Sequence, residues 1–171
     1  MKMPAWALAL ALVLLAPACT GGASNADYFA EVEGITRGLD AELDAVEASF
    51  NAGLLDINFE SATAEEQLIT LFQDSISTTA NSFAVSVGQL EQIEPPSSLT
   101  GPHEDTVSAG RFVLRAYQER IDELEAIDTL TGIDDYAISL SDTGARQRFT
   151  EACQELQIIA DGDDLDVDLS C

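Results

Sequence analysis

Basic residues are scarce in this sequence, and their scarcity excludes several classes of function. Seven lysines and arginines face 31 aspartates and glutamates over 171 residues, so the formal net charge is −24. A nucleic-acid groove requires clustered positive charge, and so does a patch that docks on anionic lipid. We therefore expect no nucleic-acid partner. The acidity is typical of a solvated surface, and attraction of cations or of a basic partner is the alternative interpretation.

Histidine and cysteine are also rare, and the motifs of many enzymes are missing. The chain has one histidine and three cysteines. A di-iron bundle needs Glu-x-x-His pairs and haem attachment needs Cys-x-x-Cys-His, and neither pattern occurs. A Gly-x-Ser-x-Gly elbow and a glycine-rich phosphate loop are absent too. We predict no enzymatic activity, no cofactor and no metal centre.

The longest apolar run stands at the N-terminus. Lys2 precedes a nearly continuous apolar segment, residues 5–16. This run is shorter than the ~20 residues of a membrane-spanning helix, and it predicts a signal peptide over residues 1–18. The sequence Leu-Ala-Pro-Ala-Cys that ends at Cys19 resembles the lipobox of bacterial membrane-anchored lipoproteins, with Ala16 where leucine is usual. The resemblance implies a diacylglycerol on the Cys19 sulfur.

The N-terminal segment also predicts where the protein lies. Residues 19–26 are read as the lipidated cysteine and a flexible Gly- and Ser-containing tether. The resemblance then implies a lipid-anchored protein on the extracytoplasmic face of the cell membrane, with the membrane as its partner. An ordinary signal peptide cleaved near Ala18 and an uncleaved anchor are the alternatives. Cleavage would remove Lys2, the only lysine, and leave six arginines against 31 acids.

Residues 27–171 are predicted to form one all-α domain, an antiparallel four-helix bundle. Apolar residues recur every three or four positions in four segments, which is the pattern of amphipathic helices. Thr63 and Glu66 match a capping box at the start of the second segment. The predicted helices cover residues 27–50, 64–93, 102–128 and 142–162, with a short helical turn at 134–140 and stops at Gly53, Pro95-Pro96 and Gly162.

The C-terminal segment alternates Leu165, Val167 and Leu169 with aspartates, which predicts an extended tail with one apolar edge. Cys153 and Cys171 bracket this segment, and three uses of the pair compete. Zinc binding requires clustered Cys and His, and a redox pair usually shows Cys-x-x-Cys. Outside the cytoplasm two thiols are usually bridged. We predict a disulfide that links the tail to the last helix, worth roughly 3 kcal/mol for its 19-residue loop.

Few residues remain as candidates for ligand binding. His103 is either a general base, metal ligand or pH sensor, or a packed histidine at a helix end. With Arg111 and Tyr117 it forms the predicted ligand-binding set. The aspartates of the segment 161–168 lack the glycine and glutamate of an EF-hand loop, so only weak divalent-cation binding is considered there.

The domain also resembles small envelope lipoproteins of unknown function. The resemblance rests on Pro95, Pro96, His103, Cys153 and Cys171, and it implies architecture and location only. The favoured hypothesis is a lipid-anchored helical bundle with a non-enzymatic binding role, for a protein or small molecule, or an envelope-structural role. The alternative is a small-ligand or divalent-cation binding module. A pocket with converging polar groups would favour the second, and a solid core with an exposed apolar patch would favour a protein partner.

Overall fold

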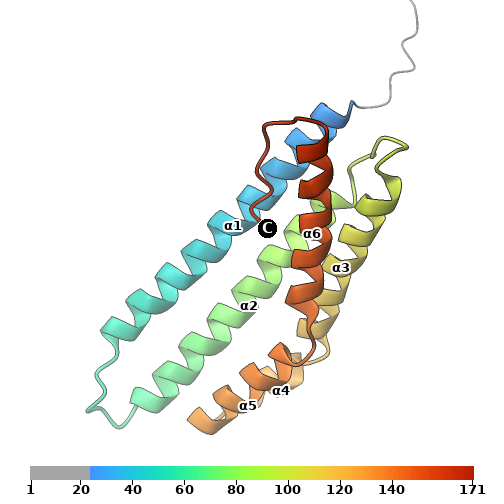
Figure 1. Ribbon diagram of the computed structural model, residues 1–171. Coiled ribbons are helices and arrows are strands. Elements are labelled where there is room, and N and C mark those ends of the chain that lie inside the picture. Colours follow the sequence, from blue (N-terminus) through green and yellow to red (C-terminus); the bar gives the residue numbers. More distant parts are fainter. Residues whose placement is uncertain (1–23) are drawn as a thin grey trace, which may run out of the picture.

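The computed structural model describes residues 24–171, and every regular element in this range is an α-helix (Figure 1). The prediction of an all-α domain is therefore confirmed. The signal peptide and the lipidation site Cys19 lie outside the described residues. The helices are α1 (Asn25–Asp56), α2 (Ala64–Leu90), α3 (Thr100–Gln118), α4 (Ile121–Glu125), α5 (Leu130–Ser141) and α6 (Ala145–Gly162).

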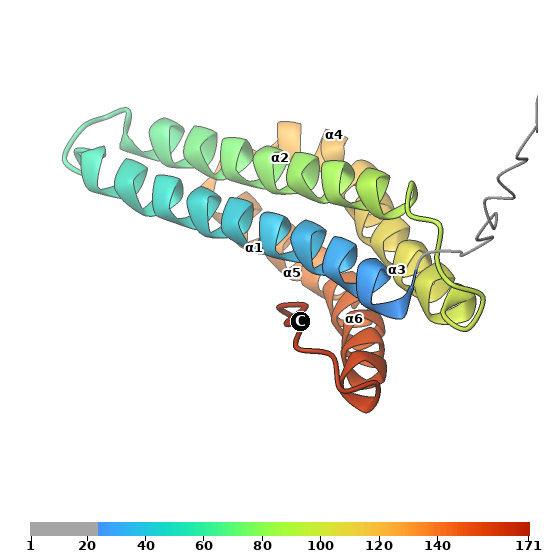
Figure 2. The ribbon, with the colours of Figure 1, turned by 90° about the horizontal axis from the view of Figure 1, so that it is seen from above.

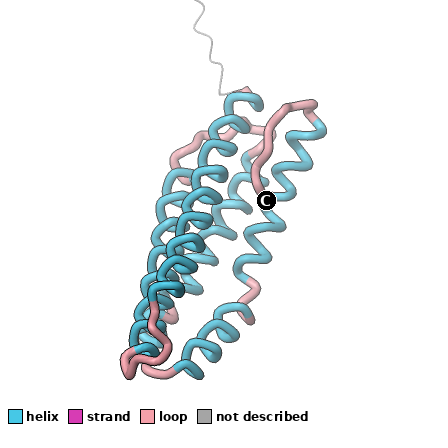
Figure 3. The backbone as a smooth tube through the Cα atoms, turned by 90° about the vertical axis from the view of Figure 1, so that its left-hand side faces the viewer, coloured by secondary structure: helices cyan, strands magenta, loops and turns pink. Residues whose placement is uncertain are grey.

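The long helices pack in pairs. α1 and α2 lie side by side and run in opposite directions, while α3 packs against both α2 and α6 (Figures 1 and 2). The short helix α5 contacts α2. The tail after α6 turns back and lies between α1 and α6 (Figures 2 and 3). α1 and α6 are thus separated by the tail and by a cavity, which is described below.

α1 is longer than predicted at both ends. Ser24 caps it: the Ser24 Oγ accepts a bond of 3.1 Å from the Asp27 N–H, and the Ser24 N–H donates to the Asp27 carboxylate. The helix thus begins inside the predicted tether. The predicted stop at Gly53 is wrong, because the helix continues to Asp56. A Cβ at Gly53 would lie 2.7 Å from the Leu71 Cδ1, so this glycine serves close packing on α2.

Two further details of the prediction are wrong. Thr63 makes no capping bond to α2, because its hydroxyl lies 2.9 Å from the Ser61 Oγ instead. The predicted helix 102–128 is broken after Gln118. Gln73 stabilises the segment beyond the break, since its side-chain amide donates to the carbonyl oxygens of Leu124 at 2.8 Å and Ile127 at 3.3 Å. The break lets α4 and α5 fold back over the first half of α2.

Three groups of buried residues follow one another along the molecule. The upper core lies at the end where α1 begins and includes Tyr28, Phe29, Leu90, Leu99, Leu156 and Leu169. The middle core contains Leu39, Phe83, Val113, Ala116, Tyr117 and Ala145. The lower core lies where α4 and α5 meet α2 and contains Ile69, Leu124, Ile127 and Tyr136.

The predicted disulfide joins Cys153 to Cys171, with 5.7 Å between their Cα atoms. The alternation of the tail is confirmed as well, because Leu169 is fully buried, Leu165 and Val167 are half-buried, and the intervening aspartates are exposed. Gln157 of α6 holds the tail by two bonds, from its amide to the Val167 carbonyl at 3.0 Å and from the Leu169 N–H to its Oε1 at 2.8 Å. No helix among residues 24–171 is long and apolar enough to cross a membrane.

Candidate functional site

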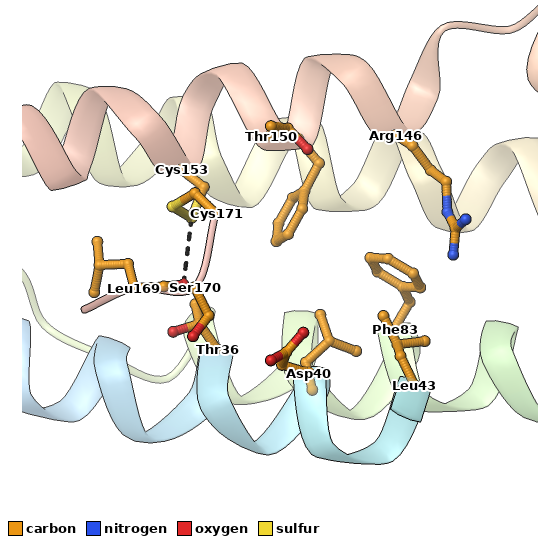
Figure 4. Close-up of a pocket in the computed structure, with 12 residues that line it drawn as sticks. Thr36, Asp40, Leu43, Phe83, Arg146, Thr150, Cys153, Leu169, Ser170 and Cys171 are labelled. Carbon is orange, nitrogen blue, oxygen red and sulfur yellow. Dashed lines mark hydrogen bonds between the residues drawn. A yellow bond between two sulfur atoms is a disulfide. The ribbon is translucent and has the colours of Figure 1, made fainter. Parts of the chain in front are cut away.

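A cavity of about 340 Å³ lies between α1 and α6, beside the end of the tail (Figure 4). Its walls come from one segment of α1, residues 36–43, and from the first half of α6, residues 146–153. Phe83 of α2 closes it from the side of the middle core. The cavity exists because α1 packs on α2 and α6 packs on α3, while α1 and α6 do not pack closely on one another.

The inner surface of the cavity is apolar and partly aromatic. Leu39 and Leu43 of α1 stand one helical turn apart, so the helix places both on the same face. The rings of Phe83 and Phe149 meet edge to face, with their centroids 5.8 Å apart. Such a surface favours contact with a further aromatic or aliphatic group.

Two opposite charges stand on facing walls. Asp40 projects from α1 and Arg146 from α6, and both point into the space between the helices (Figure 4). Among residues 24–171 neither side chain belongs to an ion pair, whereas Arg37 pairs with Glu33 at 2.8 Å and Arg111 with Glu91 at 2.7 Å. Both side chains are exposed, and Arg146 is also a hydrogen-bond partner of the Tyr117 hydroxyl. Neither charge is neutralised by an opposite charge of the described residues, so both can meet charged groups of a ligand.

The tail forms one end of the cavity. Leu169, Ser170 and Cys171 line it, and the disulfide fixes Cys171 to the wall formed by α6. The Cys153 Sγ lies 3.7 Å from the Leu169 carbonyl oxygen. This is a van der Waals contact and not a hydrogen bond, because a disulfide sulfur carries no proton to donate. Asp168 ties the tail to α1 as well, since its N–H donates to the Glu33 carboxylate at 2.9 Å. The shape of the cavity thus depends on the disulfide.

Of the three residues predicted for ligand binding, Tyr117 lines a cavity. This second cavity, of about 480 Å³, lies among α2, α3, α5 and the start of α6, and Arg146 lines both cavities. Burial raises the pKa of the Tyr117 hydroxyl, and the positive charge of Arg146 acts in the opposite direction. Arg146 therefore connects a sequence-predicted residue to the cavity between α1 and α6.

His103 is a buried residue of the upper region. Its Nδ1 lies 3.2 Å from the Tyr28 hydroxyl, and the two rings pack edge to face. Burial lowers the pKa of His103, an effect that the nearby Glu104 opposes, and burial raises the pKa of Tyr28 to about 12. The neutral forms of both side chains are thus favoured, as expected of a packed, hydrogen-bonded pair.

Arg111 lies on the surface, in its ion pair with Glu91. The three predicted residues lie at different positions along α3: His103, Arg111 and Tyr117. They do not line a common cavity. Among residues 24–171 no three His, Cys, Asp or Glu side chains are grouped so as to hold a metal ion.

Sequence reasoning missed Asp40 and Arg146. The two stand 106 positions apart in the chain, and each lies among other residues that a helix pattern reads as solvent-facing. A signal did exist for Arg146, because it is one of only two arginines near the start of the last predicted helix in a strongly acidic chain.

Comparisons of the chain with protein-family models, with curated proteins and with solved structures found no match.

Proposed function

We propose that this protein is a lipid-anchored, extracytoplasmic, non-enzymatic binding protein. In this proposal α1, α2, α3 and α6 form an antiparallel four-helix bundle, and a small organic molecule binds in the cavity between α1 and α6. The observation that carries it is this cavity, with its apolar inner surface and two unpaired charges of opposite sign. Ligand sites are typically concave, largely apolar and furnished with a few polar groups.

A small molecule is favoured over a protein partner by the arrangement of apolar side chains. The large apolar side chains that are most exposed, Leu55, Phe59, Val85, Ile138 and Ile158, belong to different elements, which does not mark one docking face. The cavity instead gathers apolar and charged groups in one place. Divalent cations are less favoured, because the described residues offer no cluster of acidic ligands.

Two features support the extracytoplasmic, lipid-anchored part of the proposal. The sequence ending at Cys19 resembles a lipobox. The Cys153–Cys171 disulfide is typical of an oxidising compartment. Since α1 begins at Asn25, shortly after Cys19, the lipid would hold the bundle by its upper end.

Binding of a neutral fluorescent probe, N-phenyl-1-naphthylamine, tests the cavity. We expect saturable binding of one probe per chain to the full protein. The variant Thr150→Trp places an indole in the cavity from its half-buried wall position, and we expect it to lose this binding. Gln154→Trp, on the exposed face of the same helix, is the matched control and retains binding. Absence of saturable binding, or equal binding by Thr150→Trp, would contradict the proposal.

The lipid anchor has a separate test. The mass of the protein extracted from membranes is expected to correspond to a chain that starts at Cys19 and carries acyl groups. The variant Cys19→Ala should lose this mass addition. A chain cleaved at Ala18 with an unmodified cysteine would remove the anchor from the proposal and leave the binding site in place.

A further inference from the structure

We infer that the ligand of this cavity is a zwitterion with an apolar body, of the class of an aromatic or large aliphatic α-amino acid. Asp40 would receive its ammonium group, Arg146 its carboxylate, and the apolar surface around Phe83 its side chain. The inference rests on the proposed function and names the ligand class of the same site.

The first argument is the pair of charges. Asp40 and Arg146 stand on facing helices and point into the same space (Figure 4). They do not approach within the 4.0 Å of an ion pair. A ligand with one group of each sign can satisfy both, because guanidinium binds carboxylate in a two-pronged geometry and a carboxylate accepts from ammonium.

The second argument is the charge of the whole protein. The formal net charge of −24 repels an anionic ligand and attracts cations to any part of the surface. Arg146 would have no role in binding a simple cation. A zwitterion carries no net charge, so it is not repelled, and its two ends match the two charges on the walls of this cavity.

The third argument is size and surface. Ligand pockets are commonly about 300–1,000 Å³, and this cavity of about 340 Å³ lies near the lower limit. A single amino acid is of suitable size for such a space. The Phe83–Phe149 pair and the leucines of α1 provide the apolar surface that an aromatic or aliphatic side chain requires. Hydroxyl groups of Thr36, Thr150 and Ser170 lie at the same cavity as additional hydrogen-bonding groups.

Displacement of the neutral probe by L-phenylalanine tests the inference on the full-length protein. N-acetyl-L-phenylalanine lacks the ammonium charge and L-phenylalaninamide lacks the carboxylate, so they isolate the two ends. We expect L-phenylalanine to displace the probe and each derivative to bind at least tenfold more weakly. Equal displacement by all three compounds would overturn the inference, because the charges would then be irrelevant.

Variants assign each end of the ligand to a side chain. Asp40→Asn should weaken binding of L-phenylalanine about tenfold and abolish its advantage over the N-acetyl derivative, and Arg146→Gln should do the same for the amide. The affinity of each variant for the neutral probe is measured first, and the displacement by each compound is compared with that value. Asp44→Asn is the matched control on α1, and Arg148→Gln is the control on α6, where Arg148 lies 4.5 Å from the centroid of the Phe112 ring. Equal losses in the controls and in the cavity variants would overturn the assignment.

The two proposals fail differently. If the neutral probe binds in the cavity and L-phenylalanine does not displace it at millimolar concentration, the amino-acid inference is wrong and the binding function stands. If the folded protein binds neither compound, the proposed function is wrong as well.

Discussion

The upper and lower ends of the molecule are built from similar helices but are held together differently. In the upper region the buried polar groups are paired: Tyr28 contacts His103, and Gln157 binds the backbone of the tail. A disulfide adds a covalent link. In the lower region Tyr136 is only 4% exposed, and its buried hydroxyl has no hydrogen-bond partner among the described residues.

The difference indicates where stability lies. The upper core is formed by long helices and the bridged tail, whereas the lower core depends on α4 with 5 residues and α5 with 12. Short helices contribute little stability of their own and depend on packing. Regions with few buried contacts open first, so we expect α4 and α5 to exchange their amide protons before the upper ends of α1 and α6. The cavity is lined by Cys153 and Leu169 of the upper core and by Leu39 and Phe83 of the middle core.

The largest expected effect comes from the upper core. Phe29→Ala removes a ring that is fully buried, and we expect the free energy of unfolding to fall by about 3–5 kcal/mol. Phe72 packs against the lower core and is only half-buried, so Phe72→Ala should cost clearly less. Urea titrations of both variants provide the measurement. Equal losses would show that the two regions do not differ in packing.

The second effect is loss of the disulfide. The double variant Cys153→Ser/Cys171→Ser should lose roughly 3 kcal/mol by the chain-entropy estimate for this loop. Hydrogen exchange should show reduced protection of the tail and of α6 from Cys153 onward, because Leu169 is then no longer held in the upper core. Amides of α4 and α5 should keep their protection. Loss of protection spread evenly over all helices would contradict a separate upper region.

A matched pair of tyrosine substitutions compares the two ends directly. Tyr28→Phe leaves His103 without its partner in a buried site, so we expect a loss of about 1–3 kcal/mol. Tyr136→Phe removes a buried hydroxyl that has no partner, and the stability should be unchanged or higher. Each change deletes one oxygen atom from a buried ring. Similar costs for both would mean that the Tyr136 hydroxyl is hydrogen-bonded in solution.

The sequence was informative where the pattern is local. Apolar spacing located the long helices, and the alternation of Leu165, Val167 and Leu169 anticipated the inward face of the tail. The oxidising compartment inferred from the N-terminus led to the Cys153–Cys171 pairing. The helix and tail predictions depend on residues that are neighbours in the chain. The disulfide prediction needs only one pair of cysteines and an oxidising compartment.

Other features depend on tertiary contacts and were not predictable. Glycine often ends a helix, but Gly53 lies inside α1, where the side chain of Leu71 occupies the space beside it. The break after Gln118 is stabilised by Gln73, a residue of another helix. The cavity arises from the separation of α1 and α6. Asp40 and Arg146 can be recognised as candidate ligand-binding residues only when that separation is known.

The smallest effect is a pH dependence that only the upper region should show, because His103 is the single histidine of the chain. Burial holds its folded-state pKa below the ordinary value of 6.5. Above that value the ring is neutral in both states. As the pH falls from 6.5 toward the folded-state pKa, the unfolded chain binds a proton at His103 that the folded chain does not bind. The free energy of unfolding therefore decreases over this range, and the decrease is complete below the folded-state pKa.

His103→Gln separates this effect from the titration of the many carboxylates, which the variant shares with the parent. Between pH 7.5 and pH 5 the parent should lose more stability than the variant, as measured by urea titrations at each pH. The change should be visible in hydrogen exchange around Tyr28, whose hydroxyl would then face an imidazolium ring beside Glu104. Amides of α5 should respond equally in both proteins, because no group in the lower region titrates as an imidazole. If the parent and the variant lost the same stability, either His103 would be exposed or the effect of Glu104 on its pKa would cancel the effect of burial. The distinction between the upper and lower regions would then rest on the Gln157 hydrogen bonds and the disulfide alone.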